Sequence, residues 1–110
     1  MKHFTEWMEE GRYKPLEETE YQQTCSLILT DGTTLSIQAS HTHYCYPRVT
    51  TYYNDYVEFE IGFPSRKIDL LMPYVEDEDH PTDTVYAYVP VSVIEQVIQE
   101  AGGILAHRKQ

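Results

Sequence analysis

The sequence predicts an α+β domain with a single antiparallel sheet of three to five strands and helices packed on one face. Several segments alternate apolar and polar residues, as half-buried strands do, and Asp31-Gly32, a pair typical of tight turns, separates two of them. Segments near both ends of the chain instead carry apolar residues at helical spacing. Strands mixed with amphipathic helices in this way are typical of a sheet that helices cover on one side.

The 110 residues fit one domain, since a chain of this length buries a single core. Phe4, Trp7 and Met8 form the stripe of a short helix that ends at Gly11, and the polar residues after it indicate a linker. We therefore divide the domain 1–110 into an N-terminal helix and linker (1–20), an α+β core (21–103) and a C-terminal tail (104–110).

A hairpin opens the predicted core. One strand places Cys25, Leu27 and Leu29 on one face, and the next does the same with Leu35, Ile37 and Ala39. A two-residue turn would put these apolar faces on opposite sides of the sheet, which a half-buried sheet does not tolerate. A three-residue loop over 30–32, with Gly32 left-handed, instead pairs Leu27 with Leu35 and Cys25 with Ile37.

Two further strands are predicted over 56–63 and 84–89. The alternation puts these side chains inward: Val57, Phe59, Ile61, Phe63, Val85, Ala87 and Val89. It puts these outward: Tyr56, Glu58, Glu60, Tyr86 and Tyr88. The outward set is polar or aromatic, so we expect that face of the sheet to be partly open.

Two helices follow these strands in the prediction. Ser65 is a candidate N-cap for a short helix that Pro73 truncates or kinks. Ser92 and Glu95 match a capping box at the start of the last helix, and Gly102 is placed to end it.

The charge of the chain is strongly acidic. Eighteen Asp and Glu against eight Lys and Arg give a net charge of −10. This balance argues against direct nucleic-acid binding and against docking on anionic membranes, because both need clustered basic residues. It fits a basic protein partner, and equally a surface whose charge only maintains solubility.

The apolar runs and the cysteines predict a cytoplasmic location. The first eleven residues have no apolar run typical of a secretory signal, and no segment is apolar enough to span a bilayer. Two cysteines, Cys25 and Cys45, do not make a disulfide framework, so we expect both thiols to be reduced.

The stretch HTHYC, residues 41–45, offers His41, His43 and Cys45 at alternate positions, which would share one face of an extended strand. They could ligate a metal or pair a thiol with a base. The hairpin register places Cys25 far from Cys45, and two residues of strand separate His43 from Cys45 by about 7 Å. We therefore predict no catalytic residues, no cofactor and no enzymatic activity. The triplet remains an alternative metal- or thiol-dependent site if the chain bends at Ser40 or Pro47.

Ten tyrosines make the outward positions unusual, because tyrosine combines a rigid apolar ring with a polar tip and is enriched at interfaces. An acidic run, 76–79, lacks the ligand pattern of a calcium loop and is predicted as a solvated loop or a docking surface. The predicted partner-binding residues are Tyr44, Tyr46, Tyr56, Glu58, Glu60, Glu76, Asp77, Glu78, Asp79, Tyr86 and Tyr88. The alternatives for the tyrosines are a second, partial core and a homodimer contact.

Three stretches, SIQASHTHYCYPR, EIGFPS and PTDTVYAYVPVSVIEQVIQEAGGI, resemble small uncharacterised proteins of bacterial prophages and mobile elements, over about the last three-quarters of the chain. The resemblance implies a phage-type role but no assigned activity or site residue. Together with the charge it predicts a small acidic, non-enzymatic binding protein. Its expected partner is a basic nucleic-acid-binding host protein, which it would inhibit as anti-CRISPR and DNA-mimic proteins do.

Overall fold

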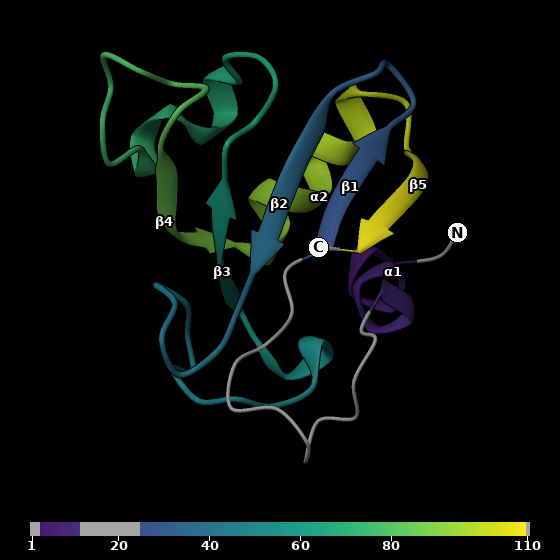
Figure 1. Ribbon diagram of the computed structural model, residues 1–110, viewed down its shortest axis with the longest axis vertical. Helices are drawn as coiled ribbons and strands as arrows, with labels where there is room; N and C mark the ends of the chain where they lie inside the picture. The colour runs from purple at the N-terminus through teal and green to yellow at the C-terminus, as the bar shows by residue number, and fades with distance from the viewer. Residues whose placement is uncertain (1–2, 12–24, 110) are drawn as a thin grey trace.

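The computed structural model describes residues 3–11 and 25–109, which form one antiparallel sheet with helices (Figure 1). In chain order the elements are α1 (Phe4–Gly11), β1 (Cys25–Leu29), β2 (Thr34–Gln38), η2 (Tyr53–Asp55), β3 (Glu58–Gly62), η3 (Asp69–Tyr74), β4 (Val85–Pro90), α2 (Val91–Glu100) and β5 (Ile104–Lys109). The five strands lie in the order β4-β3-β2-β1-β5. The predicted α+β fold with a single antiparallel sheet is confirmed, whereas the predicted linker lies outside the described residues.

The hairpin of β1 and β2 has the predicted register. Leu27 lies opposite Leu35 and Cys25 opposite Ile37. Gly32 has φ +92°, in the left-handed region that glycine adopts without strain, and its N–H donates to the Leu29 carbonyl at 2.9 Å. The three-residue loop is confirmed, because it is the connection that keeps both apolar faces on one side.

The pairing of β3 with β4 departs from simple alternation. Phe59 lies opposite Val89, but Ile61 lies opposite Tyr86, so β4 carries one extra residue. This β-bulge shifts the side-chain alternation, and Tyr86 therefore points into the core instead of outward. Tyr88, at the bulge, has φ +55°, an uncommon conformation for a residue with a Cβ.

Both ends of the predicted strand over 56–63 differ from the prediction, because regular pairing begins at Glu58 and ends at Gly62. Val57 and Phe63, expected inside, are more than half exposed, whereas Tyr56 is buried. The chain bends at Val57, and Phe63 has φ +50°, so neither residue keeps the alternation of the strand between them.

The helix ends are partly as predicted. Gly102 (φ +87°) ends α2, and the next N–H, from Gly103, donates to the Ile98 carbonyl at 2.9 Å, as in a Schellman motif. The predicted capping box is wrong, because Pro90 holds the N-cap position and makes no side-chain cap bond. Ser65 is not an N-cap either, since its Oγ accepts the Thr34 N–H at 2.9 Å and the 3-10 helix begins four residues later.

The predicted C-terminal tail is instead the edge strand β5, paired antiparallel with β1. A bulge at Leu105 interrupts the alternation, which hid this strand in the sequence, and leaves Leu105 exposed. The strand continues directly from the glycine turn after α2.

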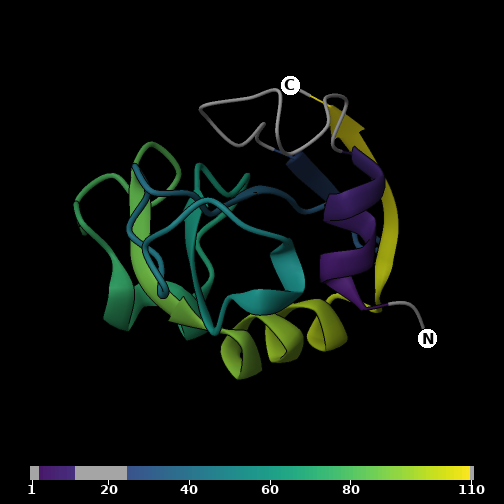
Figure 2. The same ribbon diagram turned by 90° about the horizontal axis from the view of Figure 1, so that it is seen from below.

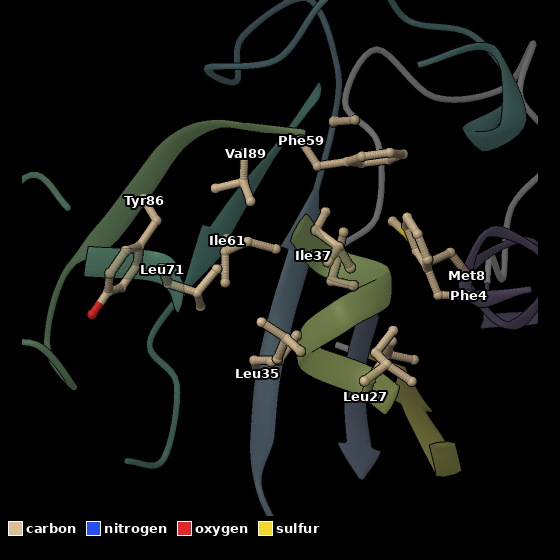
Figure 3. Close-up of a cluster of buried hydrophobic side chains, with 14 of the residues drawn as sticks. Phe4, Met8, Leu27, Leu35, Ile37, Phe59, Ile61, Leu71, Tyr86 and Val89 are labelled. Atoms are coloured by element: carbon tan, nitrogen blue, oxygen red, sulfur yellow. The ribbon is translucent and has the colours of Figure 1, made fainter. Parts of the chain in front are cut away.

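The core lies between the sheet and the helices. Figure 2 shows α1 and α2 on the same side of the sheet. Side chains from the inner faces of the strands meet Phe4 and Met8 of α1, and Leu71 and Tyr86 extend the cluster toward β4 (Figure 3). In the part of the chain that the structure describes, neither helix has the length and apolar composition needed to span a bilayer.

Candidate functional site

The segment after β2 leaves the sheet and returns to it at Tyr46. The Tyr46 N–H donates to the Glu58 carbonyl at 3.1 Å, and the Val57 N–H donates to the Tyr46 carbonyl at 2.9 Å. Between Gln38 and Tyr46 the chain bends at the fully buried Ser40. HTHYC is therefore a loop and not the continuation of a strand, so alternate side chains need not share a face.

The three residues of the predicted ligand triplet bond to other groups of the loop, and two of them, His43 and Cys45, bond to Ser40. His41 Nδ1 lies 2.6 Å from Thr50 Oγ1, and His43 Nδ1 lies 2.7 Å from Ser40 Oγ. The Cys45 thiol donates to the Ser40 carbonyl at 3.2 Å. Within residues 3–11 and 25–109, no group of three His, Cys, Asp or Glu side chains is placed to hold a metal ion. The chain does bend at Ser40 and Pro47, as the alternative required, but the three side chains do not converge on one point that could hold a metal ion.

Burial makes Cys45 a poor nucleophile and favours the neutral form of His43. Cys45 is 1% exposed, and its burial raises the pKa of the thiol. Burial of the His43 ring lowers the pKa of that imidazole, so its charged form is disfavoured. A thiolate nucleophile needs the opposite change at Cys45. The loop uses these side chains to satisfy backbone and hydroxyl groups.

The outer side of the same loop carries exposed tyrosines. Tyr44 is 40% exposed, Tyr46 62% and Tyr88 41%. The Tyr44 and Tyr88 rings lie 6.0 Å apart, and the Tyr88 N–H donates to the Tyr44 carbonyl at 3.0 Å. The loop therefore crosses the outer face of the sheet and docks on the bulge of β4, which brings Tyr44 and Tyr88 together.

A cation already lies against this cluster. The Arg48 guanidinium lies 5.4 Å from the centre of the Tyr44 ring, within the range of a cation–π contact. Glu58, half-buried, pairs with Tyr46 through the backbone. The exposed rings and a nearby carboxylate are the groups that hold arginine and lysine side chains at protein interfaces. Arg48 was not among the predicted site residues, although its place four residues after Tyr44 was visible in the sequence.

The acidic loop borders the same edge of the sheet. Val75 pairs with Tyr86 of β4, and the Glu76 N–H donates to the Val85 carbonyl at 3.0 Å. The run that follows, Glu76 to Asp79, is exposed. The His80 ring, 2.9 Å from Asp77, lowers the pKa of the Asp77 carboxyl through a hydrogen bond. Tyr88 is three residues along β4 from Val85, about 10 Å at strand spacing, so tyrosines and carboxylates share one edge.

Three predicted partner-binding residues are not on this surface. Tyr56 is 3% exposed and Tyr86 is fully buried, because a bend at Val57 and the bulge in β4 turn both rings into the core. Glu60 does point to the outer face, but it is only 7% exposed. The loop covers it, and its carboxylate accepts the Tyr44 N–H at 3.2 Å. We name the remaining set the tyrosine-acid surface: Tyr44, Tyr46, Glu58, Glu76, Asp77, Glu78, Asp79 and Tyr88.

No protein-family model, no curated protein and no solved structure matches this chain. The functional argument below therefore depends on the geometry of the tyrosine-acid surface and on the chemistry of its side chains.

Proposed function

We propose that this chain is a non-enzymatic binding protein that docks on a basic protein through the tyrosine-acid surface. The observation that carries the proposal is the shared edge: exposed tyrosine rings at the β4 bulge and an exposed run of four carboxylates border the same edge strand. Tyrosine faces and carboxylates bind guanidinium and ammonium groups through complementary contacts. The net charge of −10 adds long-range attraction to any basic surface.

Tyr88 strengthens this proposal. Its φ of +55° is a conformation that glycine adopts freely and that disfavours a side chain with a Cβ. The chain nevertheless keeps an aromatic ring there, 41% exposed. Strained residues cluster at binding sites, where the surrounding structure holds them in place. A partner that packs on the Tyr44 and Tyr88 rings gives the exposed part of this ring a use beyond its contact with Tyr44.

The proposal extends to inhibition in the cytoplasm. A basic groove that binds nucleic acid presents Arg and Lys to phosphates, and the carboxylates of residues 76–79 would occupy such positions in place of phosphates. The proposed target is a host nucleic-acid-binding protein, as expected from the sequence on the ground of a resemblance to prophage and mobile-element proteins. Docking there would block the groove without any chemical step.

The test is capture of partners from bacterial lysate at low and high salt, followed by affinity measurements on the recovered protein. We expect a basic partner whose affinity falls with ionic strength, because screening weakens contacts between exposed charges. The double variant Glu78→Gln/Asp79→Asn should weaken binding and flatten the salt dependence. Its matched control, Glu6→Gln/Glu100→Gln, removes the same charge from exposed positions on the helices and should leave both unchanged.

Two outcomes would contradict the proposal. Equal effects of the two double variants would mean that only net charge matters, and a salt-insensitive partner would contradict the charge-based proposal. Light scattering on the purified protein tests the remaining alternative. A dimer that Tyr46→Ala dissociates would assign the tyrosines to self-association instead of a basic partner.

A further inference from the structure

A cavity of about 690 Å³ opens between α1 and the C-terminal half of α2, away from the residues of the tyrosine-acid surface. Figure 2 shows the start of α1 beside the last turns of α2, and the glycine turn that leads to β5 closes the space at that end. The residues that line this groove are His3, Phe4, Trp7, Glu95, Ile98, Gln99, Gly102, Gly103 and Ile104. Its volume lies within the range of small-molecule sites, about 300–1,000 Å³.

The walls of the groove are apolar and fixed. Phe4 and Ile98 belong to the buried core, and the partly buried Trp7 and Ile104 pack against it. The Trp7 ring makes an edge contact with His107, with ring centres 5.6 Å apart. An apolar molecule that enters would meet preformed surfaces, so little side-chain ordering opposes binding.

One end of the groove carries a carboxylate. His3 Nε2 lies 3.2 Å from Glu95 Oε1, which joins α1 to α2 across the opening. On its other side, His3 Nδ1 lies 2.8 Å from Thr5 Oγ1 and 3.3 Å from the Thr5 backbone nitrogen, so Thr5 fixes the orientation of the ring. Glu95 is the acidic side chain among the residues that line the groove. The Glu95 side chain is 53% exposed and can reach a ligand in the opening.

We propose that this groove binds a small organic cation with an apolar, preferably aromatic, body. The ammonium group pairs with the Glu95 carboxylate, and the body lies against Trp7, Ile98 and Ile104. Charge complementarity selects the cation, because Glu95 is the acidic side chain of the lining. The apolar walls select the body. The site shares no residue with the tyrosine-acid surface and does not depend on the function proposed for it.

Trp7 makes the test direct, because it is the single tryptophan of the chain and lines the groove. Phenethylamine is titrated against the full chain while Trp7 emission is recorded. The probes 2-phenylethanol and 3-phenylpropionate serve as its neutral and anionic counterparts. We expect a saturable change with phenethylamine, at a dissociation constant in the millimolar range for so small a ligand. The alcohol should bind more weakly and the carboxylate most weakly.

Two variants separate this site from general charge attraction. Glu95→Gln keeps an acceptor for His3 but removes the charge, and should weaken phenethylamine binding about fivefold, as expected for a half-exposed ion pair. Its affinity for the alcohol should not change. Glu100→Gln, an equal charge change on an exposed residue of the same helix outside the groove, should have no effect.

Amide chemical shifts locate the ligand independently of Trp7. We expect phenethylamine to shift the Gly102 and Gly103 signals most, since both amides line the groove. The proposal is overturned by an absence of saturable change in both measurements. Equal affinities for amine and alcohol, equal effects of the two Gln variants, or shifts centred elsewhere would overturn it as well.

Discussion

Two loops flank the edge of β4, and each is tied to the core by one buried tyrosine. The Tyr56 hydroxyl donates to the Val49 carbonyl at 2.6 Å and accepts the Thr51 N–H at 3.0 Å, which anchors the long segment between β2 and β3. The Tyr86 hydroxyl donates to the Pro81 carbonyl and anchors the acidic loop. Both tyrosines were predicted on the outer face as partner-binding residues. They act instead as internal supports for the loops that form the surface.

The two loops differ in how much of their structure the core determines. The segment after β2 buries Ser40 and Cys45, covers Glu60 and pairs with β3 and β4. The loop over 77–83 is almost entirely exposed. The hydrogen bonds that the described residues give it are local, apart from the one that the Tyr86 hydroxyl donates to the Pro81 carbonyl. We infer that the first loop fixes the positions of the aromatic rings, while the second supplies charge from a looser framework.

The largest expected effect is that of Tyr56→Phe. It removes one hydroxyl and leaves both the Val49 carbonyl and the Thr51 N–H without their partner, which should lower the free energy of unfolding by about 2 kcal/mol. Denaturant unfolding measures this. Tyr52→Phe, at a ring that is 54% exposed, is the matched control and should change little. Equal stability of the two variants would show that the hydroxyl of Tyr56 does not hold this segment.

Tyr86→Phe should lower the free energy of unfolding by less, about 1 kcal/mol. Only one hydrogen bond is lost, and Pro81 is partly open to water. Faster amide exchange should be confined to residues 77–83. Exchange that speeds up throughout β4 as well would contradict a local anchor.

The burial of Tyr86 predicts that the free energy of unfolding depends on pH in alkaline solution. Burial raises the pKa of Tyr86 above its ordinary value of 10.0, so the folded chain keeps a proton that the unfolded chain loses. The stability contribution is complete below pH 10 and is lost as the pH rises above it through the folded pKa. Unfolding curves of the wild type and of Tyr86→Phe should therefore converge in this alkaline range. A constant difference between them would contradict the assignment.

Tyr88→Gly is expected to leave the free energy of unfolding nearly unchanged. Glycine removes the backbone cost at φ +55°, about 1 kcal/mol, but also removes the ring contact with Tyr44. Tyr88→Ala loses the ring and keeps the cost, so it should unfold more readily than Tyr88→Gly by about that amount. Binding to a basic partner should fall in both variants. A Tyr88→Gly protein that binds normally would remove Tyr88 from the proposed surface.

The smallest effect on stability is expected for Glu78→Gln/Asp79→Asn. Both side chains are exposed, and surface changes of this kind rarely alter unfolding. The thermal midpoint should match that of the wild type at low and high salt. A shift of several degrees would show that the acidic loop supports the fold, and would weaken its assignment as a charged docking element.

Sequence reasoning was sufficient where one local rule decided the outcome. Because both hairpin segments alternate, a three-residue loop at Gly32 was needed to keep their apolar faces on one side of the sheet. Glycine in the left-handed region ended α2. It failed where a single irregular residue reset the alternation. The extra residue at Tyr88 reversed the direction of Tyr86, and the bulge at Leu105 disguised β5 as a tail. Neither bulge has a glycine or proline to mark it.

The candidate site was likewise predictable from the sequence only in part. Net charge, the acidic run and the abundance of tyrosine are properties of composition, so the sequence by itself determined that the chain is acidic and aromatic-rich. Which tyrosines are exposed depended on the β4 bulge, the bend at Val57 and a loop that crosses the sheet, all set by pairing between distant segments. The groove between α1 and α2 joins residues about ninety positions apart, which no local pattern reveals. Only the tertiary structure could decide these points, because burial is determined by what packs on a residue from elsewhere in the chain.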